Sequence, residues 1–418
     1  MPIVILAWKS LVNRRYTVLL TVLSIALSVA LLTGVERIRT ETRTGFTNTL
    51  SGTDLIVGAR SGAIQLLLYS VFRIGDPTNN ISWQSYVELR DNPDVAWTVP
   101  LSLGDSHRGY RVLGTNQDYF RYYRYARDRT LQLAEGAVFS DLYDAVLGAE
   151  VAKTLGYRTG DSLIVAHGTG EVSFADHEDK PFRVAGILQP TGTPVDRTVH
   201  VSLEAIEAIH LGWQSGAPAG AGLSAEQTRN MTLTPEAISA ALIGLDSRLA
   251  IFRVQRFIND YDQEPLTAIL PGVALSQLWG LIGIAENALL VVSVFVVISG
   301  LFGMLTALLT GLNERRREMA ILRSVGARPG HIFALIVGEA GALTAAGIVT
   351  GLGLLYSLLL IGRPLIETRF GIFIPLSGLS GYETLLIGLV LLAGIVVGML
   401  PAYQAYRLSL ADGLSMRV

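Results

Sequence analysis

The chain has 418 residues, of which half are hydrophobic and only 16% are charged, and its mean hydropathy is positive. An average soluble domain carries about a quarter charged residues, so this composition argues against a purely soluble protein. The absence of cysteine excludes disulfides, zinc–thiolate sites and thiol nucleophiles. The net charge of −2 hides an asymmetry, because residues 35–287 carry 21 basic and 29 acidic side chains and the remainder carries 12 basic and 6 acidic ones.

Four long apolar segments predict four transmembrane helices. The first, residues 17–34, follows the basic segment 1–16 and has 18 residues without a charge. As a helix it would cover about 27 Å, close to the apolar thickness of a bilayer. A cleaved signal peptide would need a small-residue cleavage site, whereas Glu36-Arg37-Ile38-Arg39 follows. We therefore expect a retained span, and the other three spans are predicted at residues 288–312, 332–361 and 384–403.

The basic residues beside these spans predict the orientation. Lys9, Arg14 and Arg15 precede the first span, and five arginines lie in the loop 313–331. Because basic residues in short loops stay in the cytoplasm, this loop and the termini 1–16 and 404–418 should be cytoplasmic. The large segment 35–287 and the short loop 362–383 should face outward. In a bacterium that places the chain in the inner membrane with a periplasmic domain.

Small residues recur at four-residue spacing in the spans, which allows helix backbones to approach closely where lipid gives no hydrophobic drive. Ordinary scatter in Gly- and Ala-rich helices is the alternative. The pattern favours a packed bundle, with the first two helices as a candidate seam between two copies. The predicted packing residues are Ser24, Ser28, Gly347, Gly351, Gly394 and Gly398.

The outward segment predicts a large mixed α/β domain of two lobes on a helical stalk. Glu36–Leu50 and Leu266–Asn287 contain few breakers near the spans and should form the two halves of the stalk. Gly212–Ala225 is Gly- and Ala-rich and should be a mobile loop. Between them, apolar runs bounded by turn signals predict strands and short helices. The strands are Asp54–Val57, Val95–Leu103, Tyr110–Leu113, Ala145–Leu147, Ser162–Ala166, Phe182–Leu188 and Ile238–Leu245, and the helices are Ser82–Arg90, Ala149–Leu155 and Arg248–Tyr261.

The loop after the second span has the pattern of a docking helix. Met319, Leu322 and Val325 recur at helical spacing beside a basic flank, and Gly326 is placed to end the helix. A short cytosolic helix with one apolar edge is suited to a groove on a partner, although the basic residues alone could serve only to hold the loop inside. The candidate docking residues are Glu314, Arg315, Arg316, Arg317, Glu318, Met319, Leu322, Arg323, Gly326 and Ala327.

Four stretches resemble the MacB/FtsX/LolE-type permeases of the type VII ABC systems. ERRREMAILRSVGARPGHIFALIVGEA from Glu314 resembles their cytoplasmic loop and third helix, and AWKSLVNRRYTVLLTVLSIALSVALL resembles their first helix. VLGAEVAKTLGYRTGDSLIV with FRVAGIL resembles the core of their periplasmic domain, and PAYQAYRLSLADGL their closing segment. The resemblance implies that the loop helix couples the permease to an ABC ATPase.

The sequence has no Gly-Lys pair, so no P-loop that could cradle phosphates. We therefore expect no cofactor and no catalytic residue in this chain, with ATP and Mg²⁺ bound by a separate ATPase dimer. The resemblance also implies a second permease copy or a paralogue, most simply a homodimer. A periplasmic adaptor or binding protein is a further expected partner beside membrane lipid, whereas nucleic acid is not.

Three smaller features leave alternatives open. Asp176-His177-Glu178-Asp179, with His167 nearby, could bind a metal ion, but a solvated hairpin tip explains the same residues; His107, His200 and His210 are expected to be surface or structural. The Tyr119–Tyr125 cluster could contact a partner or could be an exposed helix or loop with packed aromatics. Glu339, the lone charge within the predicted spans, should lie at the cytoplasmic interface near the basic loop or pair across the bundle.

The predicted function is that of an ABC permease that converts ATP hydrolysis into movement of its periplasmic domain, driving export or extraction of a periplasmic or outer-leaflet substrate. A scaffold that uses the same ATPase to activate a periplasmic hydrolase or binding protein is the main alternative. A membrane receptor without an ATPase is a third hypothesis, which the docking-helix pattern disfavours.

Overall fold

The computed structural model describes residues 14–126, 128–168, 175–177, 179–211, 213–214, 217–218, 224–314, 316–324, 326–370 and 378–407. The chain divides into two compact units. Unit 1 comprises Met1–Thr42 and Gly283–Val418, and unit 2 comprises Arg43–Ile282. Gly212–Ala225, expected to be a mobile loop, lies mostly outside the described residues.

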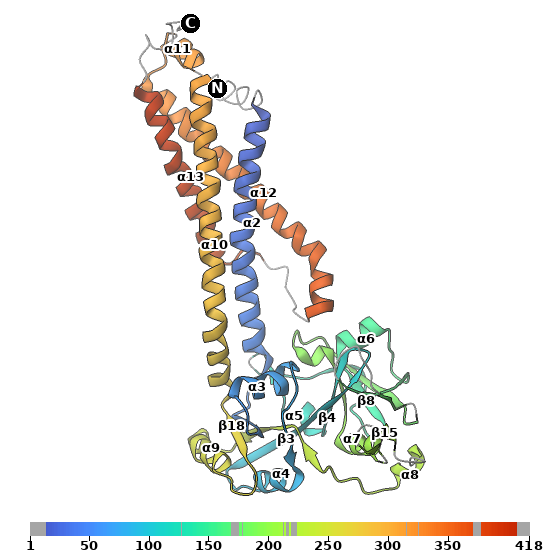
Figure 1. Cartoon of the computed structure of the whole chain (residues 1–418). Helices are drawn as coiled ribbons and strands as arrows, with labels where there is room; N and C mark the ends of the chain where they lie inside the picture. Colours follow the sequence, from blue (N-terminus) through green and yellow to red (C-terminus); the bar gives the residue numbers. More distant parts are fainter. Residues whose placement is uncertain are drawn as a thin grey trace. The chain divides into compact units, whose positions relative to one another are not determined.

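Four long apolar helices form the framework of unit 1 (Figure 1). Each contains an apolar stretch long enough to cross a membrane, which confirms the four predicted spans. The helices are longer than the spans, and the last turns of the third occupy part of the segment 362–383 that was expected to be a loop. They are α2 (Arg15–Thr49), α10 (Pro271–Glu314), α12 (Pro329–Phe370) and α13 (Gly381–Arg407), with the short α11 (Arg316–Ser324) between α10 and α12.

Small residues lie where these helices approach one another. A Cβ atom on Gly351 of α12 would come within 2.6 Å of the Ala26 backbone oxygen in α2. A Cβ on Gly394 of α13 would come within 2.2 Å of Thr344 Oγ1 in α12. Such contacts are available only to glycine, since any side chain would force the helices apart. Gly347 and Gly398 have similarly close neighbours, in α2 and α12 respectively.

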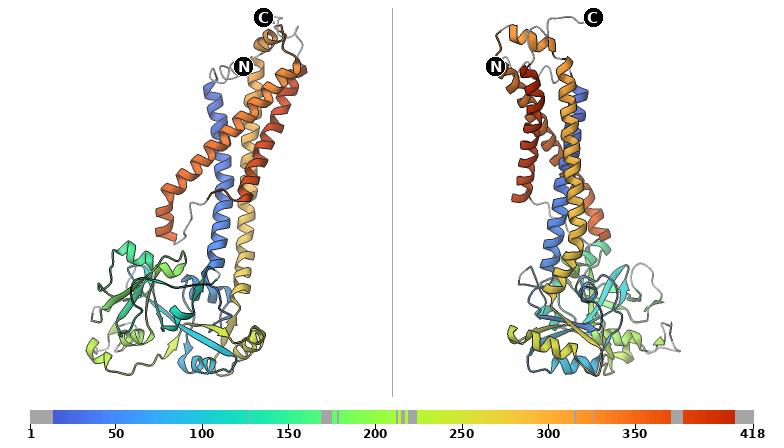
Figure 2. Two further views of the ribbon diagram at one scale, coloured as in Figure 1. Left: turned by 180° about the vertical axis from the view of Figure 1, so that it is seen from behind. Right: turned by 60° about the vertical axis from the view of Figure 1, so that its left-hand side comes forward.

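The predicted pair Ser24 and Ser28 lies between α2 and α10, which run side by side in both views of Figure 2. Ser28 Oγ donates to the Ser24 oxygen at 2.8 Å and lies 3.1 Å from the Val296 oxygen of α10. Gly300 faces the same two serines. This small-residue face therefore packs within one chain, as expected for a packed bundle, and a seam between two copies stays a prediction.

Unit 2 is a mixed sheet with helices packed against it (Figure 1). Its main sheet runs in the order β18-β1-β17-β3-β4-β13-β8-β12-β7, and the long β3 pairs with β17 through its first half and with β4 through its second. The two predicted lobes are therefore joined by one continuous sheet. The strands of this path are β1 (Leu55–Ala59), β3 (Val95–His107), β4 (Tyr110–Thr115), β7 (Leu133–Gly136), β8 (Asp144–Leu147), β12 (Phe182–Leu188), β13 (Thr198–Ser202), β17 (Ala240–Leu245) and β18 (Leu266–Ile269).

Shorter strands complete the sheets of unit 2, and several short helices connect them. The strands are β2 (Ile81–Ser82), β5 (Arg124–Tyr125), β6 (Arg129–Thr130), β9 (Ser162–Leu163), β10 (Ala166–His167), β11 (Ala175–Asp176), β14 (Trp213–Gln214), β15 (Ala217–Pro218) and β16 (Ala237–Ile238). The helices are α3 (Ala63–Leu67, continued by a π-helical turn to Phe72), α4 (Trp83–Arg90), α5 (Asp118–Tyr122), α6 (Ala149–Leu155), α7 (Leu203–His210), α8 (Ala225–Arg229) and α9 (Ile251–Asn259), with 3-10 turns at Pro194–Arg197 and Arg248–Ala250.

Most predicted elements of unit 2 are confirmed, and three are wrong in part. Ile238–Leu245 is divided between β16 and β17 rather than forming one strand. Ser162–Ala166 is split into β9 and the start of β10 rather than forming one strand. Leu266–Asn287 begins as strand β18, which pairs with β1, before α10 starts at Pro271. The alternating burial of Leu266 and Ala268 explains the strand, because both side chains enter the core under the sheet.

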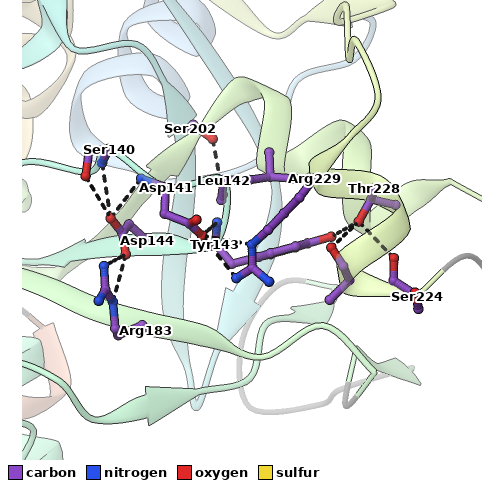
Figure 3. A network of polar contacts seen from close by, with 11 residues as sticks. Ser140, Asp141, Leu142, Tyr143, Asp144, Arg183, Ser202, Ser224, Thr228 and Arg229 are labelled. Carbon is purple, nitrogen blue, oxygen red and sulfur yellow. Dashed lines mark hydrogen bonds and ion pairs between the residues drawn. The ribbon is translucent and has the colours of Figure 1, made fainter.

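A polar network ties the short helix α8 to the start of β8 (Figure 3). The buried Asp144 carboxylate accepts a hydrogen bond at 2.7 Å from Arg183 and one at 2.9 Å from the Asp141 backbone N–H. Tyr143 and Thr228 share a hydroxyl hydrogen bond of 2.6 Å, and the Arg229 guanidinium lies over the Tyr143 ring. These contacts satisfy the polar groups that the turn before β8 buries, so a structural role explains the network.

Candidate coupling site

The short helix α11 is attached to its own bundle through Met319. This side chain is buried in a cluster with Ile332 and Ile336 of α12, Ala402 of α13 and Leu312 of α10. Met319 therefore faces the bundle, which corrects the expectation that it docks on a partner. The methionine instead connects α11 to the ends of three long helices.

The opposite side of α11 presents apolar surface to the outside. Ile321 is 54% exposed, whereas Leu322 and Arg323 are half-buried. Of the remaining candidates, Arg315 and Val325 lie outside the described residues. The backbones of Glu314, Arg316, Arg317 and Glu318 are helical, and their side chains are not described. Sequence analysis missed Ile321, because the predicted apolar edge consisted of Met319, Leu322 and Val325.

Gly326 ends α11 in the way that its position predicted. Its φ angle is 102°, a left-handed conformation that favours glycine. The Gly326 N–H donates to the Arg323 oxygen at 3.1 Å, and the Ala327 N–H donates to the Leu322 oxygen at 3.0 Å. These two bonds form a Schellman motif, which closes the helix and turns the chain toward α12.

Glu339 lines a small cavity in unit 1 together with Arg14, Thr17, Leu308 and Gly311. Arg14 precedes α2, and Gly311 is in the last turn of α10, so the cavity lies near the end of the bundle from which α11 follows. An acidic and a basic residue thus share one cavity across the bundle. This position, between helices and near the end of the bundle that leads into α11, is compatible with both expectations for Glu339.

A buried ion pair joins α2 to α13. Arg37 Nε lies 3.2 Å from Glu383 Oε1, and the two side chains are only 2% and 4% exposed. The Arg37 guanidinium also donates to Tyr356 of α12 at 3.3 Å and packs over its ring. Glu383 caps α13 as well, because its carboxylate accepts from the Ser380 N–H at 2.7 Å. Arg37 of α2 therefore contacts both α12 and α13, and sequence analysis missed this contact because its members are far apart in the chain.

In unit 2, the end of α2 and the start of α10 both enter the main core. The Phe46 ring packs against Phe72 at 4.4 Å and against Trp279 of α10 at 5.5 Å between centroids. Tyr123 donates a 2.6 Å hydrogen bond to the Thr49 backbone oxygen at the end of α2. The Tyr119–Tyr125 cluster is therefore core, with Tyr119 and Tyr123 buried, and the expectation of a partner surface or an exposed helix or loop is wrong.

Two protein-family models match this chain. The model of the MacB-like periplasmic core domain matches residues 18–241, more than half of the chain, and the model of the FtsX-like permease C-terminal region matches residues 290–410. The chain belongs to the MacB/FtsX-type permease family. It is therefore an ABC transporter permease with transmembrane helices and a MacB-like periplasmic domain, and the resemblance seen in the sequence is confirmed.

The curated relatives of this permease are export proteins that are named as combined ATP-binding/permease proteins. A macrolide export ATP-binding/permease protein, MacB of Photorhabdus laumondii, is 23% identical over 98% of this chain and 60% of its own length. A pyoverdine export ATP-binding/permease protein, PvdT of Pseudomonas syringae pv. tomato, is 23% identical over 79% of this chain and 48% of its own length. The permease thus spans roughly half the length of the curated relatives it matches.

Solved structures of periplasmic or extracellular regions also match the permease. They include the periplasmic region of MacB from Actinobacillus actinomycetemcomitans, with a TM-score of 0.34 and 11% identity over 55% of this chain and 94% of that one. The extracellular domain of YknZ from Gram-positive bacteria matches with a TM-score of 0.32 and 13% identity, over 51% of this chain and 98% of that one.

The histidines of unit 2 are arranged differently from the sequence-based expectation. His167 and His177 lie beside His210, which was expected to be isolated, and their ligand atoms are within 4.8 Å of one another. His177 is fully buried, so a solvated hairpin tip does not describe it. Glu178 lies outside the described residues. His107 and His200 are buried and bonded to the Ile164 and Val146 carbonyls, in agreement with a structural role.

Proposed function

We propose that the chain is the permease subunit of an ABC transporter in the bacterial inner membrane, driven by a separate ATPase dimer that docks on α11. Movement of α11 changes the conformation of the periplasmic domain, and that change drives export or extraction of a substrate outside the membrane. The termini and α11 face the cytoplasm, and two permease copies form the complex. The export relatives support this class of substrate movement without naming the substrate of this chain.

One observation carries the proposal. The helix α10 runs without a break for 44 residues, from Pro271 in unit 2 to Glu314 beside α11. At 1.5 Å per residue it is about 66 Å long, roughly twice the apolar thickness of a bilayer. A helix of this length connects the α11 region to unit 2 through one continuous element.

Contacts at the two ends of the long helices support transmission of movement. Met319 packs α11 onto three helices, so a displacement of α11 has to be accommodated by them. In unit 2, Phe46 and Trp279 hold the α2 and α10 segments together inside the core. Close-packed contacts of this kind transmit displacements because packed interiors are not compressible.

The docking face is tested by Ile321→Asp. An exposed apolar residue at the centre of an interface contributes strongly to affinity, so this change should reduce co-purification of the ATPase by at least about tenfold. The measurement is ATPase recovered per permease after purification in mild detergent. Leu249→Asp is the matched control, since Leu249 is an exposed leucine of unit 2 and its change should leave ATPase recovery intact.

A second variant separates docking from coupling. Met319→Ala removes the contact with the bundle without altering the exposed face, so the ATPase should still bind while its stimulation by the permease falls.

A third variant tests the basic flank of α11. Replacing Arg315, Arg316 and Arg317 with glutamate should abolish ATPase association while membrane insertion persists. Normal association and normal stimulation in both variants would refute α11 as the coupling helix.

A further inference from the structure

Four side chains in unit 2 form a compact group, here called the His–Asp cluster. It consists of Asp105, His167, His177 and His210. Asp105 is in β3 and His167 is its direct cross-strand neighbour in β10. His177 follows β11, which pairs with the other edge of β10, and His210 is the last residue of α7. The strand β3, the β10–β11 pair and the end of α7 thus bring their ligand-type side chains together.

Three atoms of the cluster form a triangle of the size that a tetrahedral metal site requires. Asp105 Oδ1 lies 3.1 Å from His167 Nδ1 and 3.6 Å from His210 Nε2. The two ring nitrogens are 3.3 Å apart. Ligands held at the 2.0–2.1 Å bond lengths of tetrahedral Zn²⁺ are separated by about 3.3–3.4 Å. Each edge of the triangle is within about 0.3 Å of that value.

His177 supplies the fourth corner. One ring nitrogen from each of His167, His177 and His210 lies within 4.8 Å of the other two, so His177 has to move toward the triangle to complete a tetrahedron. The ring centroids of His167 and His177 are 4.6 Å apart, and those of His167 and His210 are 4.5 Å apart. The three imidazoles therefore converge on one small volume, with an almost fully buried carboxylate beside them.

The protonation states of the cluster suit a cation. Burial opposes ionisation of Asp105, but its bonds to His167 and His210 prevail and lower its pKa to about 2. Burial, with the nearby imidazoles, lowers the pKa of His177 to about 4, so this ring is neutral at pH 7. Burial opposes protonation of His210, but the Asp105 carboxylate outweighs it and raises that pKa. A bound metal ion would compete with protonation of His210.

Lys180, three residues after His177, has partners outside the cluster. Lys180 is buried, donates to the Ala208 backbone oxygen at 2.9 Å and lies 3.6 Å from the exposed Asp179 carboxylate. The Lys180 ammonium group therefore interacts with α7 and with the adjacent Asp179. The Asp105 carboxylate lies within 3.6 Å of both His167 and His210, and Glu207 and Asp179 also act electrostatically on His210 and His177.

We propose that the His–Asp cluster is a binding site for a divalent transition-metal ion, with Zn²⁺ as the ion that fits it best. Imidazole nitrogen and carboxylate oxygen suit Zn²⁺, with Cu²⁺ and Ni²⁺ as chemical neighbours, whereas Mg²⁺ and Ca²⁺ require oxygen ligands. A bound ion would link β3, the β10–β11 pair and the end of α7. The site would stabilise this part of unit 2 independently of the proposed transport function.

The test measures zinc on the full-length permease in detergent, purified without a histidine tag and stripped with chelator. We expect one Zn²⁺ per chain by equilibrium dialysis and a higher melting temperature with zinc than with chelator. Loss of an outer-sphere partner typically costs 10–100-fold in affinity, so His177→Ala or His210→Ala should cost at least that much. His331→Ala is the matched control, because His331 is an exposed histidine of unit 1.

A second measurement keeps the test informative if a variant fails to fold. Co²⁺ added to the unaltered permease should give the visible absorption of a tetrahedral nitrogen–oxygen site, and Zn²⁺ should abolish it. The proposal is overturned if the stripped protein binds no zinc at micromolar concentrations or if Co²⁺ gives only an octahedral spectrum. Equal zinc binding by the folded His177→Ala and His331→Ala variants would overturn it as well.

Discussion

A buried ion pair of unit 1 and two buried histidines of unit 2 should respond to different perturbations. Unit 1 buries Arg37 and Glu383 as a charged pair, whereas unit 2 buries His107 and His200 against backbone carbonyls. Burial lowers the pKa of both histidines, and that of His200 falls to about 3. The ion pair is therefore vulnerable to loss of one partner, and the neutral histidines are vulnerable to acid.

The largest expected effect is on the ion pair. Arg37→Met leaves the Glu383 carboxylate buried without its guanidinium, which should destabilise unit 1 by about 3–5 kcal/mol. Thermal unfolding of the purified permease in detergent measures the loss. The double variant with Glu383→Gln should recover much of it, because no uncompensated charge then remains buried. Equal losses in the single and double variants would contradict a stabilising charge pair.

The acid response of unit 2 should come next in size. Folding lowers the pKa of His200 below the usual value of about 6.5. Its contribution to the free energy of unfolding is therefore fully present above pH 6.5 and is lost as the pH falls. Between pH 6.5 and 4 the loss is roughly 3 kcal/mol for this residue. Denaturant titrations of His200→Gln should therefore show a shallower decline with acid. His331→Gln should retain the original pH slope, and an unchanged slope in His200→Gln would exclude this cause.

Helix packing in unit 1 should respond to a single added side chain. Gly351→Val places a Cβ within 2.6 Å of the Ala26 oxygen, which cannot rotate away. Overpacking of this kind costs about 1–3 kcal/mol, seen as a lower melting temperature. Gly353→Val is the matched control, because no atom lies within 4 Å of the corresponding Cβ position. Similar losses for the two glycines would contradict the close contact between α2 and α12.

The smallest expected effect concerns the anchoring of α2 in unit 2. Tyr123→Phe removes the hydroxyl that donates to Thr49 and should cost about 0.5–1.5 kcal/mol. The same variant should leave the ring packing with Tyr119 unchanged, so the fold persists. Denaturant unfolding of unit 2 is the measurement. No change in stability would show that this bond does not hold the end of the helix.

Local patterns in the sequence predicted much of the fold. Length and lack of charge identified the four helices, and Gly326 was recognised as the end of α11 because a left-handed residue is a local requirement. The strand Phe182–Leu188 and the helix Ala149–Leu155 were predicted with the bounds they have. These features depend on residues that are neighbours along the chain.

Features that depend on distant pairing were not predictable in this way. Arg37 and Glu383 are 346 residues apart, and the sheet brings Asp105 opposite His167. The Tyr119–Tyr125 cluster looked like a surface because arginines separate its tyrosines, yet the tyrosines turn into the core and Arg121 packs over the Tyr122 ring. Met319 was assigned to a partner because the helix repeat alone cannot tell which neighbour covers an apolar edge.

The central claim is that α11 and unit 2 lie on opposite faces of the membrane and are connected through α10. Because the chain lacks cysteine, single cysteines at the exposed positions Ser324 and Lys153 can be labelled without a background. A membrane-impermeant maleimide added to cells with a permeabilised outer membrane should label Lys153→Cys and not Ser324→Cys. Inverted inner-membrane vesicles should give the reverse result. Labelling of both positions from one side would contradict the account.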